Sequence, residues 1–190
     1  MKCLKAKLSL KVSIPSSQLP PLCPPKPNHP PQIDCTHIID NIYISNYKTS
    51  TDYNFLKQNK FSYIINCAGG SSTFTPVLFQ EFSYLTINLR DHCESNIEEG
   101  VLQIEKFIDT LPEGGNKILF HCSEGISRAP ALVVAYLIRK KKMKYEKALS
   151  LVKEKRSIVD INIGFLIQLR NMEQGCRNSH YIFKPLYNLV

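Results

Sequence analysis

The chain has no apolar stretch of about 18 residues, the length that a transmembrane helix requires. The segment after Met1 has no continuous apolar core, so we expect no secretory signal, and the lysine at position 2 excludes N-myristoylation. The seven cysteines also lack the close paired spacing of a disulfide framework or a metal site. These absences predict reduced thiols, no membrane span and a cytoplasmic protein, with the nucleus as an alternative location.

The composition that remains is that of a globular domain. The 190 residues suffice for one domain, with 43% hydrophobic and 21% charged residues. The net charge of +8 is concentrated in two basic clusters, at positions 2–11 and 139–147. The second cluster can attract a membrane surface, nucleic acid or an acidic partner, or it can be a solvated helix end whose cations suit the helix dipole. We favour the solvated helix end and expect no nucleic-acid partner.

Residues 1–34 differ in composition from the rest, because they contain eight of the twelve prolines. Such a run favours extended polyproline conformation and cannot build a packed core. Its PxxP patterns predict either a spacer or a docking segment for an SH3- or WW-type domain. We therefore divide the chain into a proline-rich, disordered leader at 1–34, a folded domain at 35–176 and a C-terminal tail at 177–190.

The folded domain alternates strand-like and helix-like segments. Two β-favouring runs at 38–45 flank the turn-forming pair Asp40-Asn41 and predict a hairpin. Further strands are predicted at 61–67, 82–89 and 117–121. This order predicts an α/β fold with a central mixed, mostly parallel sheet of four to five strands, flanked by helices on both faces.

The helices are predicted from caps and apolar spacing. Ser50 or Thr51 can cap a first helix, and Asn162 a last one. The loop at 91–96 ends in a capping box for the second helix, formed by one of the pairs Ser95–Glu98 and Asn96–Glu99. Two more helices are expected from 129 and at 145–155, and the first of these is apolar on all sides and therefore central.

One loop, at 121–128, joins the strand at 117–121 to the central helix. Cys122, at the end of a strand and before a helix start, is placed under backbone amides and the positive helix end. Both favour the thiolate, which is the nucleophilic form. Arg128 supplies a planar fork that suits two phosphate oxygens. The loop therefore predicts a site that cleaves phosphate esters.

Two other interpretations of Cys122 need to be weighed. A buried cysteine is often a small core residue, but the glycine at 125 and the Ser127-Arg128 pair in a strand-loop-helix setting favour the anion loop. The pairs His92-Cys93 and His121-Cys122 could together supply four zinc ligands. Because neither pair has the short spacing of a zinc motif, we expect no metal.

These residues resemble a known family. His121-Cys122-x-x-Gly125-x-Ser127-Arg128 is similar to the signature loop of the cysteine-dependent protein tyrosine phosphatase superfamily, in its dual-specificity branch. The resemblance extends to four further motifs in the family's order: Ile42-Tyr43-Ile44, Asp91-x-x-x-x-Asn96-Ile97, Ala135-Tyr136-Leu137 and the closing segment from Arg156 to Leu169. It covers residues 36–174 and implies an atypical, stand-alone member with a protein tyrosine phosphatase-like fold.

The resemblance implies a role for each site residue. Cys122 is the nucleophile and Asp91 the general acid and base, while Arg128 binds phosphate and Ser127 stabilises the departing thiolate. His121 orders the loop, and Asn96 positions the backbone of the acid loop. The phosphate is held by the loop itself, namely Ser123, Glu124, Gly125, Ile126, Ser127 and Arg128. No metal or other cofactor is implied, because the loop supplies the positive potential.

Cys67 ends the strand at 61–67, which is expected to lie beside the strand that leads to Cys122. Some relatives place there a cysteine that traps the oxidised nucleophile as a disulfide. Cys67 is therefore either a redox partner of Cys122 or a core residue.

The predicted substrates are proteins phosphorylated on tyrosine and on serine or threonine, because a small domain forms a shallow pocket that admits both esters. Phosphoinositides, glycans or RNA 5′ ends are an alternative substrate class, against which the acidic Glu124 argues. An inactive phosphoprotein-binding module is the alternative from another class, but such modules typically lack one of Cys122, Asp91 and Arg128, which are all present.

Overall fold

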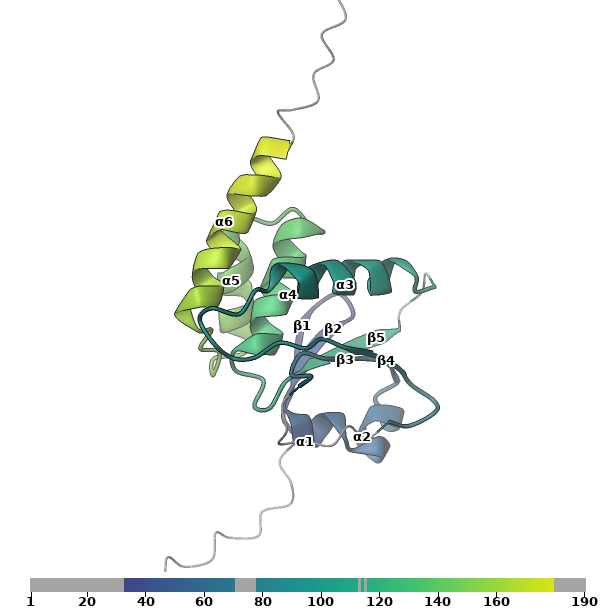
Figure 1. The fold of residues 1–190 in the computed structure, drawn as a ribbon. Coiled ribbons are helices and arrows are strands. Elements are labelled where there is room, and N and C mark those ends of the chain that lie inside the picture. The colour runs from purple at the N-terminus through teal and green to yellow at the C-terminus, as the bar shows by residue number, and fades with distance from the viewer. Residues whose placement is uncertain (1–32, 71–77, 113, 115, 180–190) are drawn as a thin grey trace, which may run out of the picture. The chain divides into compact units, whose positions relative to one another are not determined.

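The computed structural model describes residues 33–70, 78–112, 114 and 116–179 (Figure 1). Residues 1–32 of the leader, with the predicted SH3- or WW-type docking segment, lie outside the described residues, as does 180–190 of the predicted tail. The last helix continues to Ser179, into the segment assigned to the tail. Asp34, assigned to the leader, contacts the folded domain through the Arg156 side chain.

The core of the fold is one five-stranded sheet with the order β1-β2-β5-β3-β4. The strands are β1 (Cys35–Ile39), β2 (Ile42–Ser45), β3 (Phe61–Asn66), β4 (Ser83–Thr86) and β5 (Lys117–His121). β1 pairs with β2 antiparallel, and the other three pairings are parallel. The prediction of a mixed, mostly parallel sheet is confirmed.

Two details of the strands follow from the local backbone. Asp40 takes a positive φ of 47° in the β1–β2 turn, which aspartate tolerates well, so the predicted hairpin forms. β4 is shorter than the predicted strand at 82–89, because the Leu89 amide donates to the Ile87 carbonyl and so turns the chain away from the ladder.

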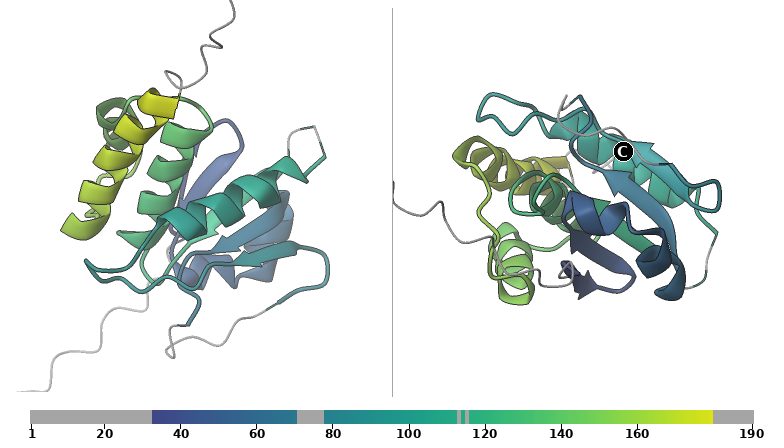
Figure 2. Two further views of the ribbon diagram at one scale, coloured as in Figure 1. Left: turned by 45° about the horizontal axis from the view of Figure 1, so that its top comes forward. Right: turned by 90° about the horizontal axis from the view of Figure 1, so that it is seen from below.

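Helices cover both faces of the sheet, as predicted. One layer contains α3 (Glu98–Asp109), α4 (Arg128–Arg139), α5 (Tyr145–Lys155) and α6 (Ile163–Ser179). The other contains the short helices α1 (Tyr47–Ser50) and α2 (Tyr53–Gln58), which lie on the opposite side of the sheet (Figures 1 and 2). The larger layer carries the main core, and α4 is buried from Arg128 to Ile138, which agrees with its apolar sequence.

The caps of the early helices differ from the prediction. α1 was not predicted, and Asn46 caps it by accepting from the Thr49 amide. Asp52, rather than Ser50 or Thr51, caps α2. Asparagine and aspartate are both preferred N-cap residues. However, helices of 4 and 6 residues are too short to show an apolar period in the sequence.

The predicted capping box before α3 does not form. Ile97 is the N-cap of α3 and makes no side-chain cap bond. The Asn96 side chain instead accepts from the Glu98 amide at 2.8 Å. The Ile97 amide donates to a side chain of α6, so its partner is distant in sequence.

Three of the six basic residues in the cluster at 139–147 form ion pairs. Arg139 pairs with Glu105 at 2.9 Å, Lys140 with Asp109 at 2.6 Å and Lys141 with Asp40 at 2.9 Å. These pairs agree with a solvated helix end. Among the described residues, no helix is both long and apolar enough to cross a bilayer.

Candidate active site

A pocket of about 370 Å³ lies at the carboxyl end of β5, where α4 begins. The carboxyl ends of parallel strands are the usual position of ligand sites in α/β sheets. The pocket combines three stretches of chain that are far apart in sequence: Asp91, then Cys122, Ser123, Glu124, Ile126, Ser127 and Arg128, then Asp160 and Asn162. The four residues predicted as catalytic, Asp91, Cys122, Ser127 and Arg128, therefore line one cavity.

The backbone of the phosphate loop, residues 122–128, is braced from outside through its carbonyl groups. The Ser123 carbonyl accepts from the Tyr47 amide at 3.0 Å, and the Ile126 carbonyl from the Asp160 amide at 3.0 Å. Because the N–H of a peptide points opposite to its C=O, carbonyls that face outward turn the next amides toward the pocket. Such converging amides form an anion-binding nest.

Arg156 braces the middle of the loop from the α5–α6 connection. Its guanidinium donates to the carbonyls of Gly125 at 2.8 Å and Glu124 at 3.2 Å. The same group makes two bonds of 2.6 Å to the Asp34 carboxylate and one of 3.0 Å to Thr36. Arg156 is only 3% exposed, so its charge is neutralised by Asp34 while its donors hold the loop.

The loop bends sharply at Gly125, whose φ is +68°. A Cβ at this position would lie 2.6 Å from the Ser45 carbonyl oxygen and 2.7 Å from Arg156 Nη2. The glycine of the motif is thus required both for its left-handed conformation and for the close approach of β2 and Arg156.

The nucleophile and the arginine are held from the same loop. Cys122 is 3% exposed, and its Sγ accepts from the Gly125 amide at 3.2 Å. Arg128 Nη2 donates to Ser123 Oγ at 2.7 Å, which fixes the plane of the guanidinium. Arg128 Nε is buried and, within the described part of the chain, has no hydrogen-bond acceptor. A buried donor without an acceptor, beside a nucleophilic sulfur, suits an incoming phosphate oxygen.

Asp91 contacts the same loop from a distant stretch of the chain. Its Oδ2 lies 3.6 Å from Arg128 Nε, and its side chain is 37% exposed. Oδ1 accepts from Ser127 Oγ at 2.7 Å and from Asn162 Nδ2 at 2.8 Å. The Ser127 hydroxyl thus donates to the carboxylate, and its predicted contact with the Cys122 thiolate remains a prediction.

The acid loop, residues 91–97, is attached to the start of α6 (Figure 1). Gln168 accepts from the Ile97 amide at 3.0 Å and donates to the Ser95 carbonyl at 2.8 Å. Gly164 packs so closely against the Cys93 carbonyl that a Cβ there would collide with it. Asn96 does not line the pocket, and its side chain accepts from the amide of Glu98, the first residue of α3, so its role in positioning the acid loop remains a prediction.

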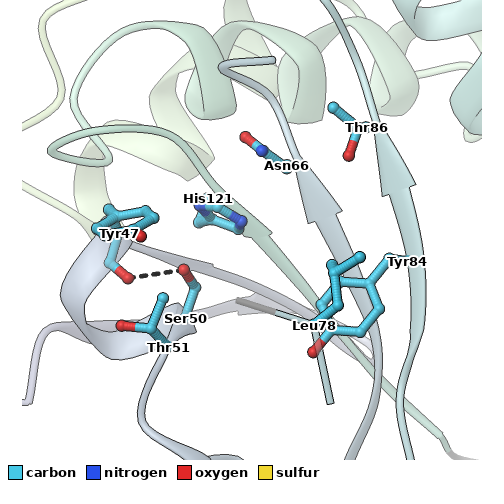
Figure 3. Close-up of a pocket in the computed structure, with 8 residues that line it drawn as sticks. All are labelled: Tyr47, Ser50, Thr51, Asn66, Leu78, Tyr84, Thr86 and His121. Carbon is cyan, nitrogen blue, oxygen red and sulfur yellow. Dashed lines mark hydrogen bonds between the residues drawn. The ribbon is translucent and has the colours of Figure 1, made fainter. Parts of the chain in front are cut away.

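His121 faces away from the phosphate pocket, into a small cavity on the α1 side of the sheet (Figure 3). This cavity of about 20 Å³ is large enough for one water. Burial lowers the pKa of His121 to about 4, although a hydrogen bond to the Cys122 backbone opposes the shift. Nδ1 is buried without a hydrogen-bond partner in the described residues. The ring is therefore neutral and does not act as a charged group toward the substrate.

Cys67 lies beside the phosphate loop and directly follows the adjacent strand, β3. Its amide donates to the His121 carbonyl at 2.7 Å, directly before Cys122. The side chain is fully buried, and burial raises the pKa of the Cys67 thiol well above its usual value, with a further contribution from Cys122. Among the described residues, no three histidine, cysteine or acidic side chains gather as a metal site would need.

Four residues of the site were not predicted to take part in the chemistry: Asp34, Arg156, Asp160 and Asn162. Asn162 was predicted only as the cap of the last helix, and it does cap α6. Arg156 and Asn162 were noted in the closing segment, but no spacing relates them to Cys122. Asp34 and Arg156 are separated by 122 positions. Only a structure could place them together, since isolated polar residues in connecting segments have no sequence signal of their own.

Comparison with known proteins agrees with this geometry. The family model described as dual specificity phosphatase, catalytic domain, matches residues 42–175. Dual specificity protein phosphatase 1 of Arabidopsis thaliana is 31% identical over 146 residues, which are 77% of this chain and 72% of that protein. Protein-tyrosine-phosphatase MKP1 of the same plant is 31% identical over 72% of this chain, and the match spans 17% of its length.

Two solved structures share the fold over nearly their whole length. The crystal structure of DUSP15 has a TM-score of 0.66 and 26% identity, covering 80% of this chain and 97% of the other. That of the human tyrosine phosphatase-like serine/threonine/tyrosine-interacting protein has a TM-score of 0.66 and 27% identity, covering 79% and 99%. The five curated relatives that head the comparison are all longer, and the matched region spans between 16% and 28% of their lengths. The chain belongs to the dual specificity phosphatase family, whose catalytic domain it contains.

Proposed function

We propose that this protein hydrolyses phosphotyrosine and phosphoserine or phosphothreonine esters in proteins, through a phosphocysteine intermediate. The observation that carries the proposal is the meeting of three groups in one pocket. Cys122 and Arg128 come from the phosphate loop, and Asp91 reaches them from 31 positions before the cysteine, with its Oδ2 3.6 Å from Arg128 Nε. A nucleophile, an anion-binding cation and a proton donor are the groups that this reaction needs.

In the first step the Cys122 thiolate attacks phosphorus. The S–P bond forms as the bond to the ester oxygen breaks, and protonated Asp91 gives its proton to that departing oxygen. Arg128 and the inward-facing amides of the loop hold the three remaining phosphoryl oxygens. Because these donors are fixed before the substrate arrives, they stabilise the charge of the transition state without reorganisation.

In the second step a water molecule attacks the phosphocysteine. Asp91, now a carboxylate, takes a proton from this water, while the S–P bond breaks and the thiolate is restored. Ser127, whose hydroxyl donates to Asp91 before substrate binds, can turn to the departing sulfur in this step. The products are the dephosphorylated protein and inorganic phosphate.

Charge at the mouth of the pocket favours protein monoesters over polyphosphorylated ligands. Glu124 and Asp160 both line the pocket and are both exposed. Two carboxylates near the bound phosphate disfavour further phosphate groups on the same ligand. Phosphoinositides and RNA 5′ ends are therefore the second candidate class.

The test is an assay of the purified protein against an aryl phosphate, phosphopeptides and phosphoinositides, beside Cys122→Ser. We expect turnover of the aryl phosphate and the phosphopeptides, and a loss of at least about 10³-fold in the variant, because the serine hydroxyl is not ionised. Activity that survives the substitution would refute the thiolate mechanism. A wild-type protein that binds phosphopeptides without turnover would be a binding module, the function class suggested by the name of one structural relative.

A second test concerns Asp91. We expect Asp91→Asn to slow an alkyl ester such as phosphoserine by about 10²-fold or more, and a nitrophenyl ester much less, because a good leaving group needs little protonation. The measurement is kcat for both esters in both proteins. An equal loss on the two esters would assign the acid to another residue.

We also propose that Cys67 traps oxidised Cys122. Peroxide would convert the Cys122 thiolate to a sulfenic acid, and the Cys67 thiol would then form the disulfide with release of water. The proposal is supported by the position of the two cysteines, each of which directly follows the end of one of two adjacent parallel strands, β3 and β5. Peptide mapping after peroxide treatment should recover a Cys67–Cys122 linked peptide, and its absence would leave Cys67 as a core residue.

A further inference from the structure

Asn162, directly before α6, joins the acid loop to the phosphate loop in the described structure, with its side chain on one loop and its backbone amide on the other. Its Nδ2 donates to Asp91 Oδ1 at 2.8 Å, and its backbone amide donates to Ser127 Oγ at 3.3 Å. Its Oδ1 accepts from the Phe165 amide at 3.0 Å and so caps α6. The residue therefore serves both a helix and the reacting groups.

The cap fixes the orientation of the amide. An asparagine side chain has one acceptor end and one donor end. Because the Phe165 amide is a donor, it must face the oxygen of Asn162, and the NH₂ group must then face Asp91. The helix start thus presents a donor, never an acceptor, to the carboxyl group.

This orientation distinguishes the two oxygens of Asp91. Oδ1 accepts from two donors, Ser127 Oγ at 2.7 Å and Asn162 Nδ2 at 2.8 Å. Ser127 is a hydroxyl and could turn to accept a proton from Oδ1, but the Asn162 NH₂ group can only donate. A proton on Oδ1 would therefore compete with this fixed donor, so a protonated Asp91 carries its proton on Oδ2. Oδ2 is the oxygen on the Arg128 side of the carboxyl group, toward the phosphate.

We propose that Asn162 is a positioning residue that selects Oδ2 of Asp91 as the proton-donating oxygen and aims it at the ester. The proposal rests on the assignment of Asp91 as general acid. Without the Asn162 donor, the carboxyl group can rotate and share its proton between the two oxygens, and fewer molecules then hold the acid in the reactive orientation. The phosphate loop, which does not depend on this amide, keeps its affinity for phosphate.

The substitution Asn162→Ser separates the two functions of the residue. Serine is as good a helix cap as asparagine, so the bond from the Phe165 amide is kept, but its hydroxyl is too short to reach Asp91. Asn162→Ala removes both the cap and the donor. If the cap alone mattered for activity, serine would rescue the alanine variant.

Two substrates of similar shape report on the acid: 4-nitrophenyl phosphate, whose leaving group needs little protonation, and phenyl phosphate, whose leaving group needs more. We expect Asn162→Ser to lower kcat for phenyl phosphate by about tenfold, a fraction of the whole effect of a general acid, and to change kcat for 4-nitrophenyl phosphate by less than about twofold. KM for both substrates and the melting temperature should remain those of the wild type.

The same substitution in the Asp91→Asn background provides the decisive control. There we expect Asn162→Ser to have no further effect, because residues that act through one group are not additive. An equal loss on both substrates, or the same loss in the two backgrounds, would overturn the positioning role. If Asp91→Asn itself fails to separate the two substrates, the acid assignment fails and this proposal with it; if Asp91→Asn behaves as expected and Asn162→Ser does not, only this proposal is refuted.

Discussion

The two sides of the pocket are built in different ways. The phosphate loop is continuous with the core: its residues are mostly buried, and its carbonyls are braced by buried or backbone donors from α1 and the α5–α6 connection. The acid loop is mostly exposed and is attached chiefly by side chains at the start of one helix, α6. The difference suggests that the contacts of the phosphate loop contribute to the free energy of unfolding. The contacts that hold Asp91 and its loop can change with little effect on that free energy.

The largest expected effect tests whether the phosphate loop contributes to the stability of the fold. Arg156→Met should lower the free energy of unfolding by about 3 kcal/mol, because it leaves Asp34 without its partner and two loop carbonyls without donors. Activity toward every ester should fall together, since the whole loop loses its brace. Urea unfolding and kcat with two esters are the measurements.

Asp34→Asn is the matched control for this variant. It removes the charge pair but leaves the bonds of Arg156 to the Gly125 and Glu124 carbonyls, so activity should be retained better than in Arg156→Met. If Arg156→Met proved as stable as the wild type, the phosphate loop would not be part of the core in the sense argued above.

The same comparison explains how much the sequence could predict. The phosphate loop was predicted because its nucleophile, glycine and arginine are contiguous, and the mostly parallel sheet because strands and helices alternate. The contact of Arg156 with Asp34 and the phosphate loop was not predicted. The two residues are 122 positions apart, and neither belongs to a local sequence pattern. The capping box before α3 was wrong for a local reason: Asn96 accepts from the Glu98 amide, two positions on, and not from the Glu99 amide. Local patterns thus predict where a helix begins better than they predict which local hydrogen bond forms there, and they do not predict contacts between distant residues such as Asp34 and Arg156.

A second prediction concerns His121, at the end of β5, and the dependence of the free energy of unfolding on pH. The pKa of His121 is about 4 in the folded protein, below the ordinary value of 6.5, because the buried ring resists protonation. The unfolded chain therefore binds the proton more readily between these values, and stability declines as the pH falls through this window. The contribution of His121 to the free energy of unfolding should fall by about 3 kcal/mol between pH 6.5 and 4.

His121→Gln is the control, because glutamine does not titrate. Carboxylates that titrate in the same range are common to both proteins, so the difference between their urea-unfolding curves isolates the histidine. The stability difference between wild type and variant should change with pH in the direction that favours the variant at low pH. If the difference in stability between wild type and variant did not depend on pH, the His121 ring would be solvated in the folded protein. This result would weaken the claim that the phosphate loop is part of the core.

The smallest expected effect tests the exposed side. Gln168→Leu keeps the size of the side chain but removes both bonds to the acid loop, at Ile97 and Ser95. Stability should fall by about 1 kcal/mol, because one buried amide loses its acceptor. Activity should fall selectively, by about threefold on phenyl phosphate and hardly at all on 4-nitrophenyl phosphate, since only the poorer leaving group depends on the acid.

The selectivity of this last loss, rather than its size, decides the comparison. Gln168→Glu keeps the acceptor for the Ile97 amide and loses the donor to the Ser95 carbonyl, so its effect should lie between those of the wild type and Gln168→Leu. If Gln168→Leu instead slowed both esters equally, as Arg156→Met is expected to do, the acid loop would be coupled to the phosphate loop and the two sides would form one unit. A selective loss with nearly unchanged stability would mean that the proton donor is set by contacts at the start of α6, and that exchange of these few side chains can alter the chemistry without rebuilding the phosphate site.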